Sequence, residues 1–138
     1  MKVQAYITFG GRCDEALAFY KQTLGAEVGT VMRWKDSPDE AMKGPPGYED
    51  KIMHADFTIG STTLMADDGM GPGKVEYKGF TLSLTVADDP EAQRVFTALG
   101  ESGSVTMPLM KTFWTSSFGM LTDKFGVPWM VNVEAPRA

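Results

Sequence analysis

Hydrophobic and polar residues alternate along several short stretches of the chain, and each such stretch predicts a β-strand with one buried face. The predicted strands cover residues 3–9, 26–34, 52–59, 62–67, 80–86, 104–110, 112–121 and 127–133. Only Gly60 and Ser61 separate the third strand from the fourth. A short turn of this composition predicts a β-hairpin.

The first strand of this hairpin carries the most informative polar residues of the sequence. His54 and Asp56 share one face of the strand, whereas Ala55 and Phe57 point toward the other. The apolar face needs a layer to pack against. We therefore expect a functional site on the face with His54, which is the only histidine of the chain.

Two segments change from alternation to helical spacing. In residues 13–24 the apolar residues recur every three or four positions, and Gly25 follows as the expected C-cap. In the second segment, Asp89 is expected to cap a helix whose first position is Pro90, and Gly100 is expected to end it.

The order strand, helix and three strands therefore occurs twice, which predicts an α+β fold of two βαβββ modules in tandem. Module one covers residues 1–68 and module two residues 79–138, within a single domain. The glycine-rich residues 69–78 are the expected linker, and residues 37–50 form a long loop rich in proline and glycine. Each sheet has one helix, so we expect the two halves to form one concave mixed sheet.

Composition limits the classes of partner. The length of 138 residues, the hydrophobic content of 43% and the charged content of 22% are ordinary for one globular domain. A net charge of −5 without a basic stripe argues against nucleic acid or an anionic membrane as a partner. The single cysteine, Cys13, suits a reducing compartment. No signal peptide or membrane-spanning stretch is evident, so we expect a cytoplasmic location.

Two sequence motifs carry a resemblance to a known superfamily. With LAFYKQTLGAEV in the first helix and DKFGVPWMVNV at the end, the chain resembles the vicinal oxygen chelate superfamily of glyoxalase I, bleomycin-resistance proteins and extradiol dioxygenases. The segments IMHADFTIGSTTLMADDG and GFTLSLTV are similar to its PhnB-like branch, which is often labelled 3-demethylubiquinone-9 3-methyltransferase. The resemblance implies the glyoxalase/bleomycin-resistance fold and, usually, a homodimer.

The resemblance also implies positions for a metal. In metal-using members, His, Glu or Gln side chains on the first and last strands of each module bind it. The corresponding positions here are Ala5, Met65 or its neighbours, residues 81–83 and Met130. None of these is a good hard-metal ligand, and methionine suits soft copper at best. Because His54 is the only histidine, we expect no metal and no cofactor.

The methyltransferase label predicts a glycine-rich turn after the first strand of a doubly wound sheet, where enzymes of that class bind their cofactor. Gly10 and Gly11 do follow a predicted strand, but the sequence GGRCDEA lacks the rest of that turn. The residues therefore do not support the activity in the label.

The expected ligand-binding residues come from both predicted modules. They are His54, Asp56, Met65, Trp114, Phe118 and Met130. His54 is the best polar contact, as a general base or a ligand contact, although a histidine satisfied by a backbone carbonyl is the simpler interpretation.

Methionines and aromatic residues allow two interpretations each. The ten methionines can line an adaptable apolar cavity or fill the core, and we expect most of them in the core. The larger aromatic residues can wall a flat pocket or pack between the modules; they are Trp34, Phe113, Trp114, Phe118 and Trp129. Cys13 is expected to be a packed thiol, although a helix start could also lower its pKa.

Three functional hypotheses follow. The first is a metal-free protein that binds a small, partly apolar molecule in a cleft built from both modules. The second is a metal-dependent lyase, isomerase or dioxygenase whose ligands come partly from the second subunit of a dimer. The third is a non-catalytic dimer that docks onto a protein partner through residues 37–50.

Overall fold

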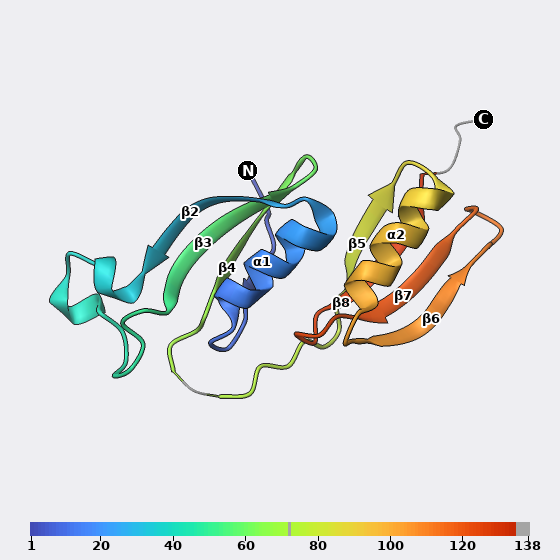
Figure 1. Cartoon of the computed structure of the whole chain (residues 1–138). Coiled ribbons are helices and arrows are strands. Elements are labelled where there is room, and N and C mark those ends of the chain that lie inside the picture. Colours follow the sequence, from blue (N-terminus) through green and yellow to red (C-terminus); the bar gives the residue numbers. More distant parts are fainter. Residues whose placement is uncertain (72, 135–138) are drawn as a thin grey trace. The chain divides into compact units, whose positions relative to one another are not determined.

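The computed structural model describes residues 1–71 and 73–134 (Figure 1). Its elements follow the predicted order, with two short 3-10 turns in addition. In chain order they are β1 (Tyr6–Thr8), α1 (Cys13–Leu24), β2 (Glu27–Arg33), η1 (Trp34–Asp36), η2 (Glu40–Met42), β3 (Ile52–Ile59), β4 (Thr62–Asp67), β5 (Leu82–Val86), α2 (Asp89–Gly100), β6 (Ser104–Met110), β7 (Phe118–Thr122) and β8 (Pro128–Val133).

The chain divides into two compact units, Met1–Val75 and Glu76–Ala138. The first unit holds a four-stranded sheet in the order β1-β4-β3-β2, and the second a four-stranded sheet in the order β5-β8-β7-β6. In each sheet one pair is parallel, β1 with β4 and β5 with β8, and the others are antiparallel. The predicted α+β class and the repeated βαβββ order are confirmed, whereas a concave surface shared by both halves stays a prediction.

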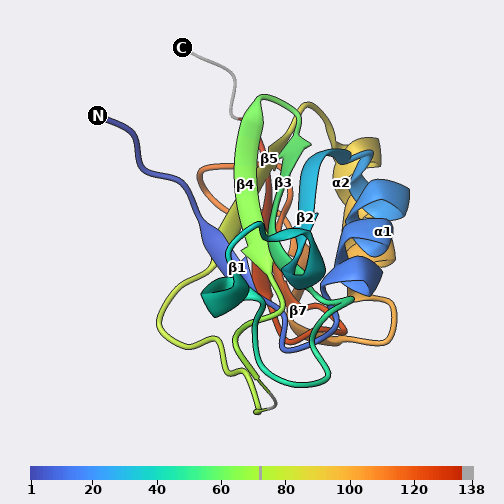
Figure 2. The ribbon, with the colours of Figure 1, turned by 90° about the vertical axis from the view of Figure 1, so that its left-hand side faces the viewer.

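In the first unit, α1 covers one face of the sheet (Figure 2). Tyr20 of the helix is fully buried, and its ring stacks on Phe57 of β3 at 5.9 Å between centroids. Gly25 ends the helix in the left-handed conformation with φ 67°, as predicted, and its N–H donates to the Lys21 carbonyl. Phe57 therefore marks the helix-covered face of this sheet, and its neighbours on the strand mark the helix-free face.

A buried carboxylate fixes the start of α1. Asp68 is 1% exposed and accepts the N–H groups of Cys13 and Ile52, each over 2.7 Å. An anionic side chain at a helix N-terminus is stabilising there. Burial, followed by the negative charge of Asp68, raises the pKa of the Cys13 thiol far above its usual value. Cys13 is thus a packed thiol, as expected, and Asp68 has a structural role.

In the second unit, α2 covers one face of the sheet. The opposite face carries polar and methionine side chains at alternating strand positions. The buried residues of α2 are Ala92, Val95, Phe96 and Leu99, and Leu121, Trp129 and Val131 of the sheet are buried as well. Asp123 is almost fully buried and accepts the N–H groups of Phe125 and Val127 and the Trp129 indole N–H. This carboxylate organises the predicted turn between β7 and β8.

Two sequence predictions in the second unit are wrong. The helix cap is Asp88, whose carboxylate accepts the Glu91 N–H over 2.9 Å. Asp89 instead accepts the hydroxyls of Ser116 and Ser117, at 2.6 and 2.7 Å. Consecutive aspartates offer equivalent caps, and only the tertiary partners distinguish them.

The seventh strand also begins later than predicted, at Phe118 and not at Thr112. The Thr112 N–H donates to the Thr115 carbonyl, and the Thr115 hydroxyl donates to the Val133 carbonyl over 2.7 Å. These bonds close a turn, so the alternation between Thr112 and Ser117 does not reflect strand pairing. Within residues 1–71 and 73–134, no helix is long and apolar enough to cross a membrane.

Candidate functional site

The helix-free face of the first sheet carries the histidine identified in the sequence. Tyr6 of β1 lies opposite Met65 of β4, and Met65 lies opposite Asp56 of β3. Residues directly opposite each other on neighbouring strands share a face. Because Phe57 packs against α1, the row of Tyr6, Met65 and Asp56 lies on the helix-free side.

A hydrogen-bonded group of three side chains stands on this face. The Tyr6 hydroxyl donates to Asp67 Oδ2 over 3.1 Å, and Nδ1 of His54 lies 3.4 Å from the Tyr6 oxygen. The Tyr6 and His54 rings are tilted at 5.7 Å between centroids. The Gly69 N–H holds the other Asp67 oxygen at 3.1 Å. His54 thus bonds to Tyr6, and among residues 1–71 and 73–134 no backbone carbonyl bonds to its ring, which differs from the simpler interpretation.

The electrostatics of this group set the direction of its hydrogen bonds. Burial and then the negative charge of Asp67 raise the pKa of Tyr6 to about 12. At neutral pH the phenol therefore keeps its proton and donates it to the Asp67 carboxylate. The Tyr6 oxygen is then left to accept a hydrogen bond from Nδ1–H of His54, which leaves Nε2 of a neutral His54 as an acceptor.

Asp56 has a structural task on the same face. Two residues of β2, Gly29 and Thr30, stand opposite Asp56 alone, which is a β-bulge. The Asp56 carboxylate accepts the Thr30 N–H over 3.2 Å. A Cβ at position 29 would collide with the same Asp56 oxygen, so the bulge requires glycine. Asp56 therefore holds the bulge, whether or not it also contacts a ligand.

Tyr6 is the candidate site residue that the sequence interpretation missed. The interpretation assigned the first-strand site position to Ala5, whereas Tyr6 occupies the helix-free face and bonds to Asp67. The signal was present, because the alternation places Tyr6 on the opposite face from Ile7 and Phe9.

The helix-free face of the second sheet is neutral and rich in sulfur. One row runs from Ser83 through Met130 and Met120 to Met107 across all four strands. The next row runs from Thr85 through Asn132 and Phe118 to Met110. At the strand positions of these two rows, which the structure describes completely, no side chain is charged.

Aromatic rings continue this face at one end. The Trp114 and Phe118 rings meet edge to face at 5.3 Å, and Phe113 packs on Trp114 at 4.9 Å. Phe113 is 97% exposed and Trp114 is 47% exposed. The predicted residues Trp114, Phe118 and Met130 therefore belong to one surface of the second unit, whereas His54, Asp56 and Met65 belong to one surface of the first.

The expectation for the methionines is wrong. No methionine is among the buried residues of the part that the structure describes, which includes all ten. Strand alternation does not reveal which face a methionine occupies, because the apolar thioether is compatible with either face. Trp34 and Trp129 are buried, so neither belongs to an exposed aromatic wall.

The residues at the superfamily's metal positions do not fit a hard or borderline metal ion. In this chain they include Met65 and Met130, whose sulfur is a poor ligand for such ions. Tyr6, which lies beside Ala5, has a raised pKa that opposes metal binding as phenolate. Within residues 1–71 and 73–134, no group of three or more His, Cys, Asp or Glu side chains could hold a metal.

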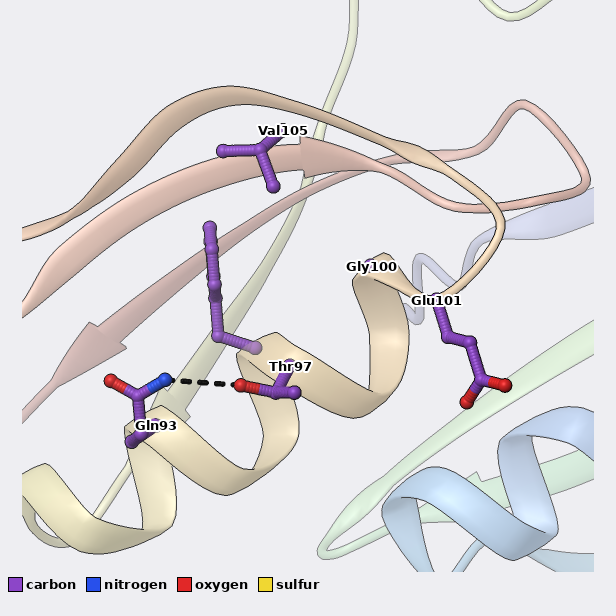
Figure 3. A pocket seen from close by; sticks show the side chains of 6 residues that line it. Gln93, Thr97, Gly100, Glu101 and Val105 are labelled. Carbon is purple, nitrogen blue, oxygen red and sulfur yellow. Dashed lines mark hydrogen bonds between the residues drawn. The ribbon is translucent and has the colours of Figure 1, made fainter.

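A depression of about 550 Å³ on the second unit lies apart from all the predicted site residues. It is lined by Gln93, Phe96, Thr97, Gly100, Glu101 and Val105. Figure 3 shows Gln93 and Thr97 joined by a hydrogen bond along α2, with Val105 on β6. Of these six lining residues, Gln93 and Thr97 bond to each other, and Glu101 is the single charged one.

Comparison with known proteins identifies the family. A family model described as 3-demethylubiquinone-9 3-methyltransferase matches residues 1–132. The chain is 39% identical over 140 residues to Protein YjdN of Escherichia coli strain K12, which covers 96% of this chain and 95% of YjdN. The chain belongs to this family, the PhnB-like branch that its motifs predicted.

Solved structures agree with this assignment. Protein PA1353 from Pseudomonas aeruginosa is 46% identical, with a TM-score of 0.84 over 97% of this chain and 98% of that one. The PhnB protein from Bacillus cereus is 26% identical, with a TM-score of 0.81 over 97% and 100%. A glyoxylase/bleomycin resistance protein/dioxygenase domain from Frankia is 12% identical, with a TM-score of 0.68 over 96% of each chain, and shows the same fold.

The family description implies S-adenosylmethionine, and the turn after β1 does not fit this cofactor. The N-terminus of α1, where a dinucleotide-type fold would receive an anionic group, is already occupied by the Asp68 carboxylate. A Cβ at Gly10 would lie 2.9 Å from the Val75 side chain, so that turn is filled from within the unit. Each sheet is also mostly antiparallel.

Proposed function

We propose that this protein binds a small, partly apolar molecule on the helix-free faces of its sheets, without a resident metal. The observation that carries the proposal is the Tyr6–Asp67–His54 group on a face that α1 leaves uncovered. Polar side chains that bond to one another on a sheet face, beside apolar neighbours such as Met65, are typical of sites that orient a ligand.

Charge supports a ligand that donates hydrogen bonds. The helix-free positions of the first sheet include the carboxylates of Glu27, Asp56 and Asp67. Over the described strands β1 to β4, no lysine or arginine shares this face, because Arg33 pairs with Asp14 of α1 on the helix-covered side. An anionic ligand would meet carboxylates without a cation, so an amine-bearing or neutral ligand is favoured.

The uncharged helix-free face of the second sheet favours a ligand whose remaining atoms are apolar. Thioethers adapt to irregular shapes, and the Trp114 and Phe118 rings offer flat contact area. Each face is proposed here as a contact surface in its own right. Binding ranks ahead of catalysis because, among residues 1–71 and 73–134, no hard-metal donor set supports the chemistry of the metal-dependent superfamily members.

A thermal-shift screen tests the proposal. Aromatic amines are compared with carboxylic acids of matched size, using wild type, Tyr6→Phe, Asp67→Asn and the control Tyr48→Phe, which alters a tyrosine in the loop. We expect amines to stabilise the wild type, and affinity to fall about 2- to 10-fold in the two site variants. A preference for the carboxylic acids, or equal binding by the site variants, would contradict the proposal.

Elemental analysis after incubation with Zn, Ni, Mn and Fe salts completes the test. We expect no stoichiometric retention after desalting. Metal that is retained by the wild type and lost in His54→Ala would contradict the metal-free proposal and favour the metal-dependent enzyme hypothesis. We further propose a cytoplasmic homodimer, from the family resemblance and the single cysteine; sedimentation and cell fractionation test these two points.

A further inference from the structure

Asn132 of β8 lies at the centre of the helix-free face of the second sheet. It stands opposite Phe118 on β7 and opposite Thr85 on β5, two residues along the strand from Met130. Its Oδ1 atom is buried and has no hydrogen-bond partner among the described residues. Buried polar atoms are nearly always hydrogen-bonded, so this acceptor needs an explanation.

We propose that Asn132 Oδ1 is a ligand subsite that accepts a hydrogen bond from an N–H or O–H group of an otherwise apolar molecule. This inference rests on the proposed function and names the chemistry of one anchoring point. A buried acceptor without a donor destabilises the unliganded protein. Because Oδ1 is buried, a ligand donor reaches it when a flexible neighbour such as Met130 moves aside, and the hydrogen bond then removes that penalty.

The neighbours of Asn132 define the rest of the ligand. Phe118 on β7 lies directly opposite Asn132. In the next row, two residues along each strand, Met120 lies opposite Met130. The Phe118 ring is extended by Trp114 at 5.3 Å. Thioethers and ring edges make favourable contacts with aromatic molecules. The subsite therefore fits a flat aromatic ring with one donor, such as a heteroaromatic N–H.

The absence of charge gives the subsite its selectivity. The two cross-strand rows that include Met130 and Asn132 carry no charged side chain over their described positions. Along these two rows, a ligand that presents a donor to Oδ1 meets apolar side chains and neutral hydroxyls. An analogue of the same shape without the donor leaves the acceptor buried and unpaired, which lowers its affinity.

Indole and N-methylindole are the probes, because they differ in the N–H donor and little in shape. Binding to the full chain is measured by calorimetry for wild type, Asn132→Leu, Asn132→Asp and the control Thr85→Val. We expect the wild type to bind indole at least about 3- to 10-fold more tightly than N-methylindole. Asn132→Leu should bind both probes equally, whereas Asn132→Asp and Thr85→Val should keep the preference.

The thermal stability of the ligand-free protein provides a second test. If Oδ1 has no partner in the free protein, Asn132→Leu should raise the Tm, because it removes an unpaired polar atom and keeps the volume. A lower Tm in Asn132→Leu would show a structural role and overturn the proposal. Binding of both indoles without preference would overturn the subsite alone, whereas no binding of any small molecule in either screen would overturn the proposed function with it.

Discussion

Tyr6 and Asp67 are joined across the parallel pair of strands by a hydrogen bond of 3.1 Å between the phenol oxygen and Oδ2. Burial and this carboxylate raise the pKa of Tyr6 from 10.0 to about 12. We expect a late tyrosine transition near pH 12 in an ultraviolet absorbance titration. The late transition should disappear in Tyr6→Phe.

Replacement of the partner separates the two causes of this shift. In Asp67→Asn the negative charge is lost while the burial remains, so the late transition should move toward pH 10 without reaching it. Tyr48→Phe serves as the control and should leave the late transition in place. A transition that does not move in Asp67→Asn would show that the Asp67 charge does not raise the pKa of Tyr6.

The bulge at Gly29 predicts a steric effect on stability. A Cβ added there collides with Asp56 Oδ1, so either the carboxylate moves and releases the Thr30 N–H or the strand shifts. We expect Gly29→Ala to lower the free energy of unfolding by about 1–3 kcal/mol in urea denaturation.

A double-mutant cycle identifies the collision as the cause. Asp56→Ala removes the obstructing side chain, so Gly29→Ala should be much less destabilising in an Asp56→Ala background. Gly73→Ala is the matched control, because a Cβ at position 73 meets nothing within 4 Å. Additive effects of Gly29→Ala and Asp56→Ala would show that the strain lies elsewhere.

Replacement of Asp123, in the turn between β7 and β8, by the similarly sized asparagine should strongly lower the free energy of unfolding. In Asp123→Asn the carboxamide keeps the size, but its NH₂ group faces a donor, either the backbone N–H groups or the Trp129 indole. We expect a loss of about 2–4 kcal/mol and altered tryptophan fluorescence. Asp39→Asn, on an exposed loop residue, should change the stability by less than about 0.5 kcal/mol.

The ion pair of Asp14 and Arg33 predicts a pH effect. Hydrogen bonds from the Arg33 guanidinium, at 2.8 and 3.0 Å, hold the pKa of the Asp14 carboxyl below its usual 3.8. A lowered pKa in the folded state contributes stability that is present above the unfolded pKa and is lost as the pH falls through the folded one.

Urea midpoints from pH 7 to pH 2.5 measure this effect. The wild type should lose more stability below about pH 4 than Asp14→Asn does. Because the Asp14 side chain is 61% exposed, solvent screening limits the difference to less than about 1 kcal/mol. Identical acid profiles would show that the pair contributes nothing to folding.

The periodic parts of the fold could be predicted from sequence because local chemistry determines them. The hairpin of residues 52–59 and 62–67 has the bounds that its alternation and Gly60-Ser61 predicted. The helix that ends before Gly25 also follows from local spacing and the C-cap. In these segments every residue choice favours the same structure, so no distant partner is needed to decide it.

The turn before β7 and the cap of α2 could not be predicted, because competing local choices were settled by distant partners. Thr115 is held by the carbonyl of Val133, 18 positions away. Asp89 is occupied by Ser116 and Ser117, which leaves the cap to Asp88. Both outcomes depend on bonds that appear only when the sheet has formed.

The sequence by itself determined the repeated βαβββ order, the family and the strand faces that carry His54 and Met130. The family follows from its motifs, and the faces follow because alternation with period two places side chains along an unbroken strand. Only the tertiary structure decided which of those side chains meet. The pairing of β1 with β4 brings Tyr6 to Asp67, 61 positions apart, and cross-strand register sets Asn132 opposite Phe118. Register is a long-range property of backbone hydrogen bonding, and a single strand does not contain it.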